Sequence, residues 1–164
     1  MVLAVYTLTH RELTRFFRQR NRVIGAFAQP IIFWLLFGAG LRGSFNRAAV
    51  GELSYMEYFV PGVAALILLF TAIFSTISII EDRREGFLQS VLVAPVPRAG
   101  LVLGKLLGGT LLAVLQGALF FVLAALTQDG IVLSLKNAAC LLGAMFLVAF
   151  ALTGLGFAIA WRSE

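Results

Sequence analysis

The sequence predicts an all-α membrane protein: a polytopic bundle of four transmembrane helices, with an amphipathic interfacial helix before them and a short cytoplasmic helix between the second and the third. Composition is the first reason, because 60% of the 164 residues are apolar and only 13% are charged, whereas about a quarter of the residues of a soluble domain are charged. The second reason is that the apolar residues gather in four long uncharged segments. Residues 1–164 are therefore expected to form one transmembrane domain.

Residues 1–22 have the pattern of an amphipathic helix. At 100° per residue, four arginines fall within about 40° of one line, and apolar side chains cover the opposite face. These arginines are Arg11, Arg15, Arg18 and Arg22. We expect the helix to lie flat on the cytoplasmic leaflet, with the basic stripe facing lipid phosphates or an acidic partner. The alternative is a solvated helix that packs on another protein.

Four uncharged segments follow, at residues 23–41, 59–80, 106–127 and 137–161. A helix rises about 1.5 Å per residue, so each segment is about 28 to 38 Å long and can cross a hydrocarbon core of about 30 Å. The sequence therefore predicts four spans.

The basic residues predict the orientation of these spans. Ten of the thirteen lie before the first span, between the second and third, or after the fourth, and three lie in the other two connections. By the positive-inside rule, the N-terminus and residue 164 are cytoplasmic in a multi-pass protein of the cell membrane. The net charge of +5 then reflects topology, and we expect no nucleic-acid partner.

The cytoplasmic connection, residues 81–105, contains an apolar stretch that is too short to span a bilayer. Phe87 pairs with Val91, and Leu88 with Leu92, at the i to i+4 spacing of one helical face. Such a face on a short cytosolic helix is typical of docking into a partner's groove. The alternative is that it packs back onto the amphipathic helix of the same chain.

Within the spans, small and polar residues indicate how the helices pack. Gly109, Ala113 and Gly117 recur at four-residue spacing on the third span, a pattern of close helix packing either within one subunit or between two. Gln29 and Gln116 are strongly polar side chains deep in the spans. They either line a substrate path or hydrogen-bond between helices.

The chain shows no sign of catalysis or metal binding. The predicted spans hold no Asp, Glu, His, Lys or Arg, which proton relays, intramembrane proteases and metal hydrolases need. The stretch from Gly100 to Lys105 departs from a phosphate-binding loop, because three residues separate its glycines instead of four and Leu106 replaces the Ser or Thr. We expect no catalytic residue, metal or cofactor in this chain.

Several segments taken together resemble the type-2 ATP-binding-cassette exporter permeases. They are the aromatic-rich run 54–62, which ends in Pro-Gly, the loop 82–88 with its Arg-Glu-Gly sequence, and the stretches 92–98 and 103–107. Their order and their placement relative to the four spans carry the match, which extends over essentially the whole chain. Members of that family usually have six spans, so we expect this chain to correspond to the N-terminal two thirds.

The resemblance implies a permease subunit that works as a dimer, most simply with a second copy of itself. Cytoplasmic ATP-binding subunits, which hold ATP and Mg, would dock on its cytoplasmic face, and membrane lipids would surround it. Residues 5–22 match the family's interface helix, and residues 84–92 match its coupling helix. The residues that the resemblance assigns to ATPase coupling are Arg84, Glu85, Gly86, Phe87, Leu88, Val91, Leu92 and Pro95.

The expected function is ATP-driven export of an amphiphilic, lipid-like, drug or polysaccharide substrate. The alternative is a membrane assembly or regulatory protein that transports nothing, or an inactive, truncated permease.

Overall fold

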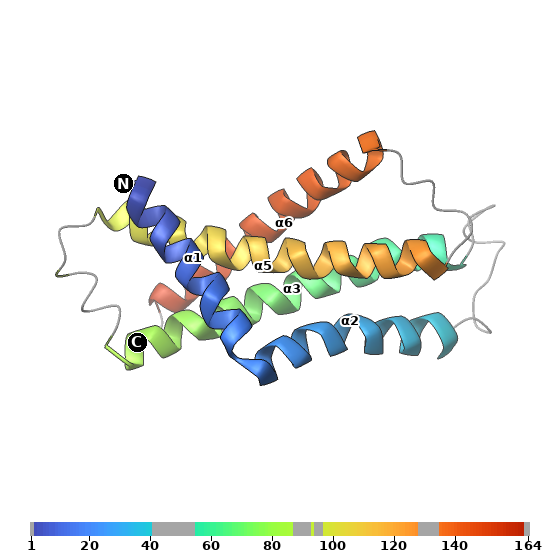
Figure 1. The fold of residues 1–164 in the computed structure, drawn as a ribbon, viewed down its shortest axis with the longest axis horizontal. Coiled ribbons are helices and arrows are strands. Elements are labelled where there is room, and N and C mark those ends of the chain that lie inside the picture. The colour runs from blue at the N-terminus through green and yellow to red at the C-terminus, as the bar shows by residue number, and fades with distance from the viewer. Residues whose placement is uncertain (1, 41–54, 87–92, 94–96, 128–134, 163–164) are drawn as a thin grey trace.

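The computed structural model describes residues 2–40, 55–86, 93, 97–127 and 135–162. The regular structure in these residues is helical, as the sequence predicts. The helices are α1 (Val2–Arg18), α2 (Arg20–Gly40), α3 (Tyr55–Arg84), α5 (Arg98–Thr127) and α6 (Leu135–Arg162). Helices α2, α3 and α5 extend along the molecule, α6 runs obliquely to them, and α1 crosses α5 near one end (Figure 1).

Within the described residues, three helices are long and apolar enough to cross a membrane. They are the segments Phe59–Arg84 of α3, Arg98–Leu126 of α5 and Lys136–Arg162 of α6. At about 1.5 Å per residue, each is about 39 to 44 Å long and exceeds a hydrocarbon core of about 30 Å. Helix α2 corresponds to the first expected span, and it continues through Pro30 to Gly40. The chain is therefore a multi-pass helical membrane protein.

The helices around the expected cytoplasmic loop are longer than the spans that the sequence predicts. Helix α3 continues to Arg84, and α5 already begins at Arg98, so both extend into the connection expected at residues 81–105. The chain leaves α3 at Gly86, whose φ of 75° is the left-handed conformation typical of a helix C-terminus. The carbonyl of Pro97 accepts the amide of Gly100 at 2.8 Å and starts α5.

The aromatic-rich run that ends in Pro-Gly forms the start of α3. Residues 55–62 are helical, and Pro61 lies inside α3. Proline is tolerated in membrane helices because neighbouring groups satisfy the backbone that it frees.

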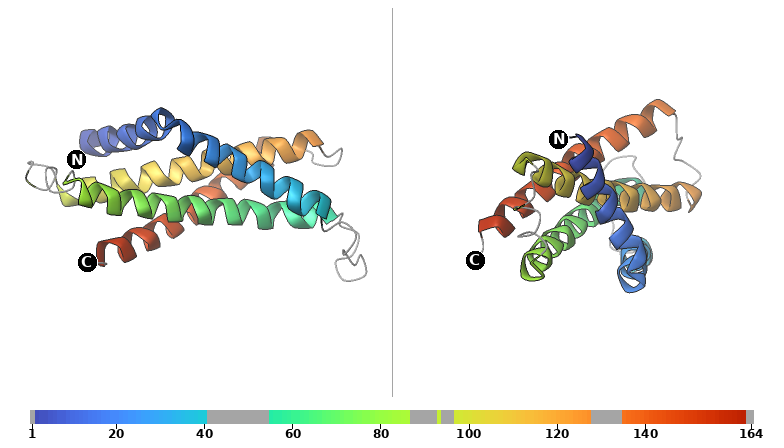
Figure 2. Two further views of the ribbon diagram at one scale, coloured as in Figure 1. Left: turned by 90° about the horizontal axis from the view of Figure 1, so that it is seen from below. Right: turned by 60° about the vertical axis from the view of Figure 1, so that its left-hand side comes forward.

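A break at Gln19 separates the amphipathic lead-in from α2. The amide of Gln19 donates to the carbonyl of Arg15 at 3.2 Å, and its own carbonyl accepts the amide of Val23 at 3.0 Å. The chain changes direction there, so that α1 and α2 form a bent pair (Figure 2). Arg22, the last member of the predicted stripe, consequently belongs to α2.

The core lies among α3, α5 and α6. Ile67 of α3 and Phe120 of α5 are fully enclosed, and Phe33 and Trp34 of α2 pack against their cluster. Helix α6 is much less covered, because 17% of its most apolar stretch is buried, compared with 44% for α3 and for α5. Most of α6 therefore faces outward.

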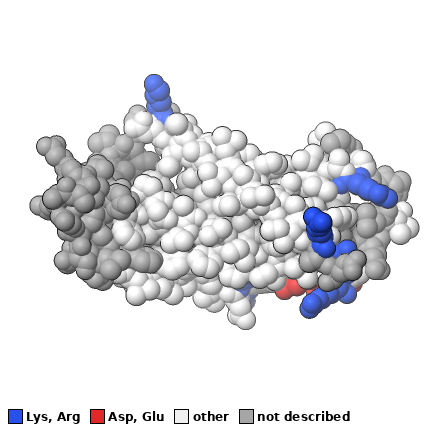
Figure 3. Space-filling view, turned by 180° about the vertical axis from the view of Figure 1, so that it is seen from behind, with Lys and Arg blue, Asp and Glu red and all other residues white. Residues whose placement is uncertain are grey.

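One end of the bundle combines several helix ends with a concentration of charged side chains. The start of α1, the end of α6 and the α3 and α5 ends of the 81–105 connection all lie there (Figures 1 and 2). Basic side chains gather toward that end on the face in Figure 3, beside a wide band of uncharged surface. The expectation that the two chain ends lie on one side of the membrane is consistent with this arrangement.

Candidate functional site

Buried charges join α1, α3 and α5 at this end of the bundle. The side chains of Asp82 on α3 and Lys105 on α5 are 0% and 3% exposed and form an ion pair. Lys105 Nζ also donates to Glu12 Oε1 of α1, and Arg15 Nη1 of α1 donates to Asp82 Oδ1 at 2.5 Å. Four charges from three helices thus compensate one another, as burial of charge requires.

Further ion pairs surround this centre at longer distances. Arg11 Nη2 lies 3.4 Å from Asp82 Oδ1, and Arg22 Nη2 of α2 lies 3.4 Å from Glu81 Oε2. Arg15 Nη2 is 3.7 Å from both Glu81 Oε2 and Glu85 Oε2. We call the whole group the charge cluster; its members are Arg11, Glu12, Arg15, Arg22, Glu81, Asp82, Glu85 and Lys105.

The predicted basic stripe therefore has carboxylate partners within the chain. Arg11, Arg15 and Arg22 face α3, whereas Arg18 is exposed. The apolar face of α1 is only partly covered, because Phe16 is buried and Phe17 is half exposed. Contact of the stripe with lipid phosphates stays a prediction.

Two glycines of α5 allow α1 to approach closely. A Cβ atom at Gly104 would lie 2.7 Å from Leu8 Cβ, and one at Gly108 would lie 2.8 Å from Glu12 Cβ. Thr9 Oγ1 donates to the carbonyl of Gly104 at 3.2 Å. The docking of α1 on α5 thus depends on backbone contact as well as on charge.

The predicted small-residue face of α5 packs inside the subunit. A Cβ atom at Gly109 would clash with Ser75 of α3 and Thr153 of α6, and one at Gly117 would clash with Met145 of α6. Ala113, between them, is fully buried. These contacts are those of the intrasubunit arrangement that the sequence left open, and packing of the same face between subunits stays a prediction.

The residues expected to couple to an ATPase are only partly described. Arg84 is the last residue of α3, Glu85 contacts Arg15, and Gly86 has the left-handed conformation that ends the helix. The other five lie outside the described residues: Phe87, Leu88, Val91, Leu92 and Pro95. Their docking to a partner stays a prediction.

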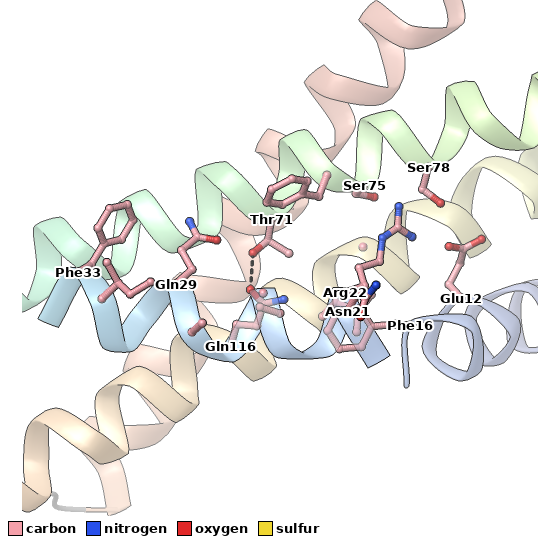
Figure 4. Close-up of a pocket in the computed structure, with 17 residues that line it drawn as sticks. Glu12, Phe16, Asn21, Arg22, Gln29, Phe33, Thr71, Ser75, Ser78 and Gln116 are labelled. Atoms are coloured by element: carbon pink, nitrogen blue, oxygen red, sulfur yellow. Dashed lines mark hydrogen bonds between the residues drawn. The ribbon is translucent and has the colours of Figure 1, made fainter. Parts of the chain in front are cut away.

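A cavity of about 480 Å³ lies between α1, α2, α3 and α5 (Figure 4). Its volume falls within the range of about 300 to 1,000 Å³ that is typical of ligand sites. Glu12, Asn21 and Arg22 line one end, which borders the charge cluster. Phe33 of α2 lines the other end (Figure 4).

Amide and hydroxyl groups line the middle of this cavity. Thr71 Oγ1 of α3 lies 2.8 Å from Gln116 Oε1 of α5 and the same distance from the carbonyl of Ile67. Gln29 of α2 lines the cavity beside them (Figure 4). Gln116 thus contacts α3 between helices and also lines a cavity. Its place in a substrate path stays a prediction.

Sequence reasoning missed the charge cluster. It treated Lys105 as a topological charge and gave Asp82 no partner, although each stands at the boundary of an apolar segment. One signal was present: Glu12 is an acid directly beside the basic stripe. An acid in that position indicates an ionic contact more specific than attraction to a lipid surface.

The long apolar helices, the concentration of charge at one end and the cavity among the helices define a multi-pass membrane protein with a site inside its bundle. Residues 4–164 match the family model for the ABC-2 type transporter. The chain therefore belongs to the ABC-2 type transporter family and is a membrane permease component, which confirms the resemblance recognised in the sequence.

A similar protein from Cyanophora paradoxa is named as a transport permease, ycf38. It is 29% identical over 92 residues, which are 56% of this chain and 32% of that relative. The match therefore covers about a third of the relative's length. No solved structure matches this chain.

Proposed function

We propose that this chain is the membrane-spanning subunit of an exporter that moves an amphiphilic substrate with ATP hydrolysed by a partner subunit. Membership of the ABC-2 type transporter family supports an ATP-binding partner. ATP and Mg bind in that partner, and a second permease subunit, most simply another copy of this chain, completes the pathway. Membership of the ABC-2 type transporter family is the observation on which this proposal rests.

In this proposal α2 is a fourth span, and both chain ends face the cytoplasm of a cell membrane. The uncharged length of residues 23–41 and the helix at Arg20–Gly40 support the span. The excess of basic residues at the end of the bundle shared by α1 and the 81–105 connection supports the orientation.

The charge cluster supports a mechanism in which the ATPase moves several helices together. The segment expected to contact the ATPase, residues 84–92, starts at the last residue of α3, and α5 begins after it at Arg98. Before this segment in the chain, Asp82 of α3 pairs with Arg15 of α1, and after it Lys105 of α5 pairs with Glu12 of α1. Because Asp82 and Lys105 also pair with each other, a force on this segment acts on α1, α3 and α5 at once.

The decisive experiment places acidic side chains on the predicted docking face. Phe87→Asp combined with Leu88→Asp abolishes copurification of the ATPase and leaves membrane insertion unchanged, because a charged face no longer fits an apolar groove. Val93→Asp is the matched control: Val93 is 88% exposed and lies off the predicted apolar face, so the ATPase is retained. Undiminished ATPase binding by the double variant contradicts the proposal.

A second measurement separates export from a purely assembly or regulatory role. Vesicles reconstituted with the permease and its ATPase are assayed for ATP turnover with and without candidate amphiphiles. A transporter gives substrate-stimulated turnover. A complex that assembles and hydrolyses ATP with no response to any amphiphile favours the regulatory alternative.

A further inference from the structure

The end of the cavity beside the charge cluster combines a cation with an unused hydroxyl group. Ser78 of α3 lines the cavity and is 5% exposed, and its Oγ has no hydrogen-bond partner among the described residues. A buried hydroxyl without a partner is unfavourable. Figure 4 shows the guanidinium of Arg22 extending from α2 toward Ser78. In that view the two groups face each other across this end of the cavity.

Arg22 retains donor capacity at this point. A guanidinium has five N–H donors, and within the described part of the chain Arg22 contacts one carboxylate, Glu81, at 3.4 Å. Glu12 also lines this end, but its carboxylate is paired with Lys105 and Arg11. The positive charge facing the cavity is therefore less fully compensated than the negative one.

Beyond the charged end, apolar side chains of α2 and α3 form much of the wall and offer room for a hydrocarbon chain beside the amide and hydroxyl groups in the middle of the cavity. The cavity continues from Arg22 along α2 past Ala28 to Ile32, with Phe74 of α3 also in its lining. Ile32 and Phe74 are each 51% exposed, so the cavity has an apolar opening on the flank of the bundle. Ser78 stands one helical turn before Asp82, at the edge of the apolar span, which is the depth of lipid headgroups.

From this arrangement we propose that the cavity binds a membrane phospholipid. The phosphate accepts hydrogen bonds from Arg22 and Ser78, and one acyl chain extends past Ala28 toward Ile32. Arginine suits this role because its planar fork matches two phosphate oxygens. The cavity is charged at the headgroup end and, apart from the amide and hydroxyl groups in its middle, lined mainly by apolar groups beyond it, so its polarity parallels that of the lipid. The proposal is argued from residues of this chain and does not depend on the proposed ATP-driven export.

Native mass spectrometry of the full chain, purified in detergent and stripped of lipid, tests the proposal. The probes are dioleoyl phosphatidylglycerol and dioleoylglycerol, which has the same chains and no phosphate. We expect phosphatidylglycerol to bind at least tenfold more tightly. Arg22→Gln weakens its binding by about tenfold, since charge-assisted hydrogen bonds are lost, whereas the matched variant Arg20→Gln, at an exposed position outside the cavity lining, leaves it unchanged.

Two further variants separate binding from folding. Ser78→Ala removes a hydroxyl that has no partner in the described structure, so it weakens phosphatidylglycerol binding several-fold while leaving lipid-free stability equal or higher. Gly25→Phe fills the cavity from α2, where a Cβ atom meets nothing within 4 Å, and reduces the binding of both probes. Equal losses in Arg20→Gln and Arg22→Gln, or full binding by Gly25→Phe, overturn the proposal.

Discussion

Replacing the buried carboxylate of Asp82 with an amide tests whether the charge cluster holds α1 on the bundle. Asp82→Asn keeps the shape of the side chain but removes the charge that pairs with Lys105, Arg15 and Arg11. The side chain is 0% exposed, and removing one partner of a buried ion pair costs about 3 to 5 kcal/mol. We expect a loss of that size in the free energy of unfolding.

Glu81→Gln is the matched control on the adjacent residue. It removes the same charge, but the Glu81 side chain is 44% exposed and its contacts with Arg15 and Arg22 are 3.7 and 3.4 Å long. Such exposed pairs contribute at most about 1 kcal/mol. The expected losses for the two variants therefore differ at least about threefold.

The assay is reversible unfolding in mixed micelles, followed by helical circular dichroism as the denaturing detergent is raised. A double-mutant cycle with Lys105→Gln then isolates the pair, and we expect an interaction energy above about 1 kcal/mol because the two residues are in direct contact. A loss for Asp82→Asn no larger than that for Glu81→Gln would refute the reasoning.

Other substitutions probe the packing of the same helices. Gly104→Leu forces α1 away from α5, because a Cβ atom at this position lies 2.7 Å from Leu8 Cβ. We expect it to lower the free energy of unfolding in the same assay by about 1 to 3 kcal/mol. Gly154→Leu is the control, since a Cβ atom there meets nothing within 4 Å, and should have no comparable effect. Gly86→Ala, at a φ of 75°, costs about 1 to 2 kcal/mol, and an unchanged denaturation midpoint would contradict its role in ending α3. Gln116→Leu breaks a hydrogen bond to α3 and costs about 0.6 to 1.7 kcal/mol by the same titration.

The apolar runs in the sequence predicted the helical membrane fold because hydrophobic length is a local property. The helix ends were less predictable, since they depend on contacts with distant residues. Lys105, for example, looks like the last residue of a cytosolic loop until Glu12, which is 93 positions earlier, is placed beside it. A scan along the chain detects uncharged segments and cannot detect this pairing.

The cavity was still less visible in the sequence. Its lining comes from four helices and includes Glu12 and Gln116 at opposite ends of the range. Gln29 and Gln116 were recognised as unusual because they are polar residues in apolar segments. Ser78 and Arg22 were not recognised as a pair, because serine is common in membrane helices and arginine is expected at their ends.

The distances within the charge cluster indicate which contacts hold α1 on the bundle. The inner contacts, from Asp82 to Lys105 and Arg15, are close and shielded from solvent. At the rim, Arg15 Nη2 lies 3.7 Å from both Glu81 and Glu85, so a small displacement shortens one contact as it lengthens the other. Exchange between equivalent carboxylates has little net cost, whereas separation of the buried pair has a large one. The contacts of Arg15 and Glu12 with this pair, rather than those of Arg15 with Glu81 and Glu85, therefore hold α1 on the bundle.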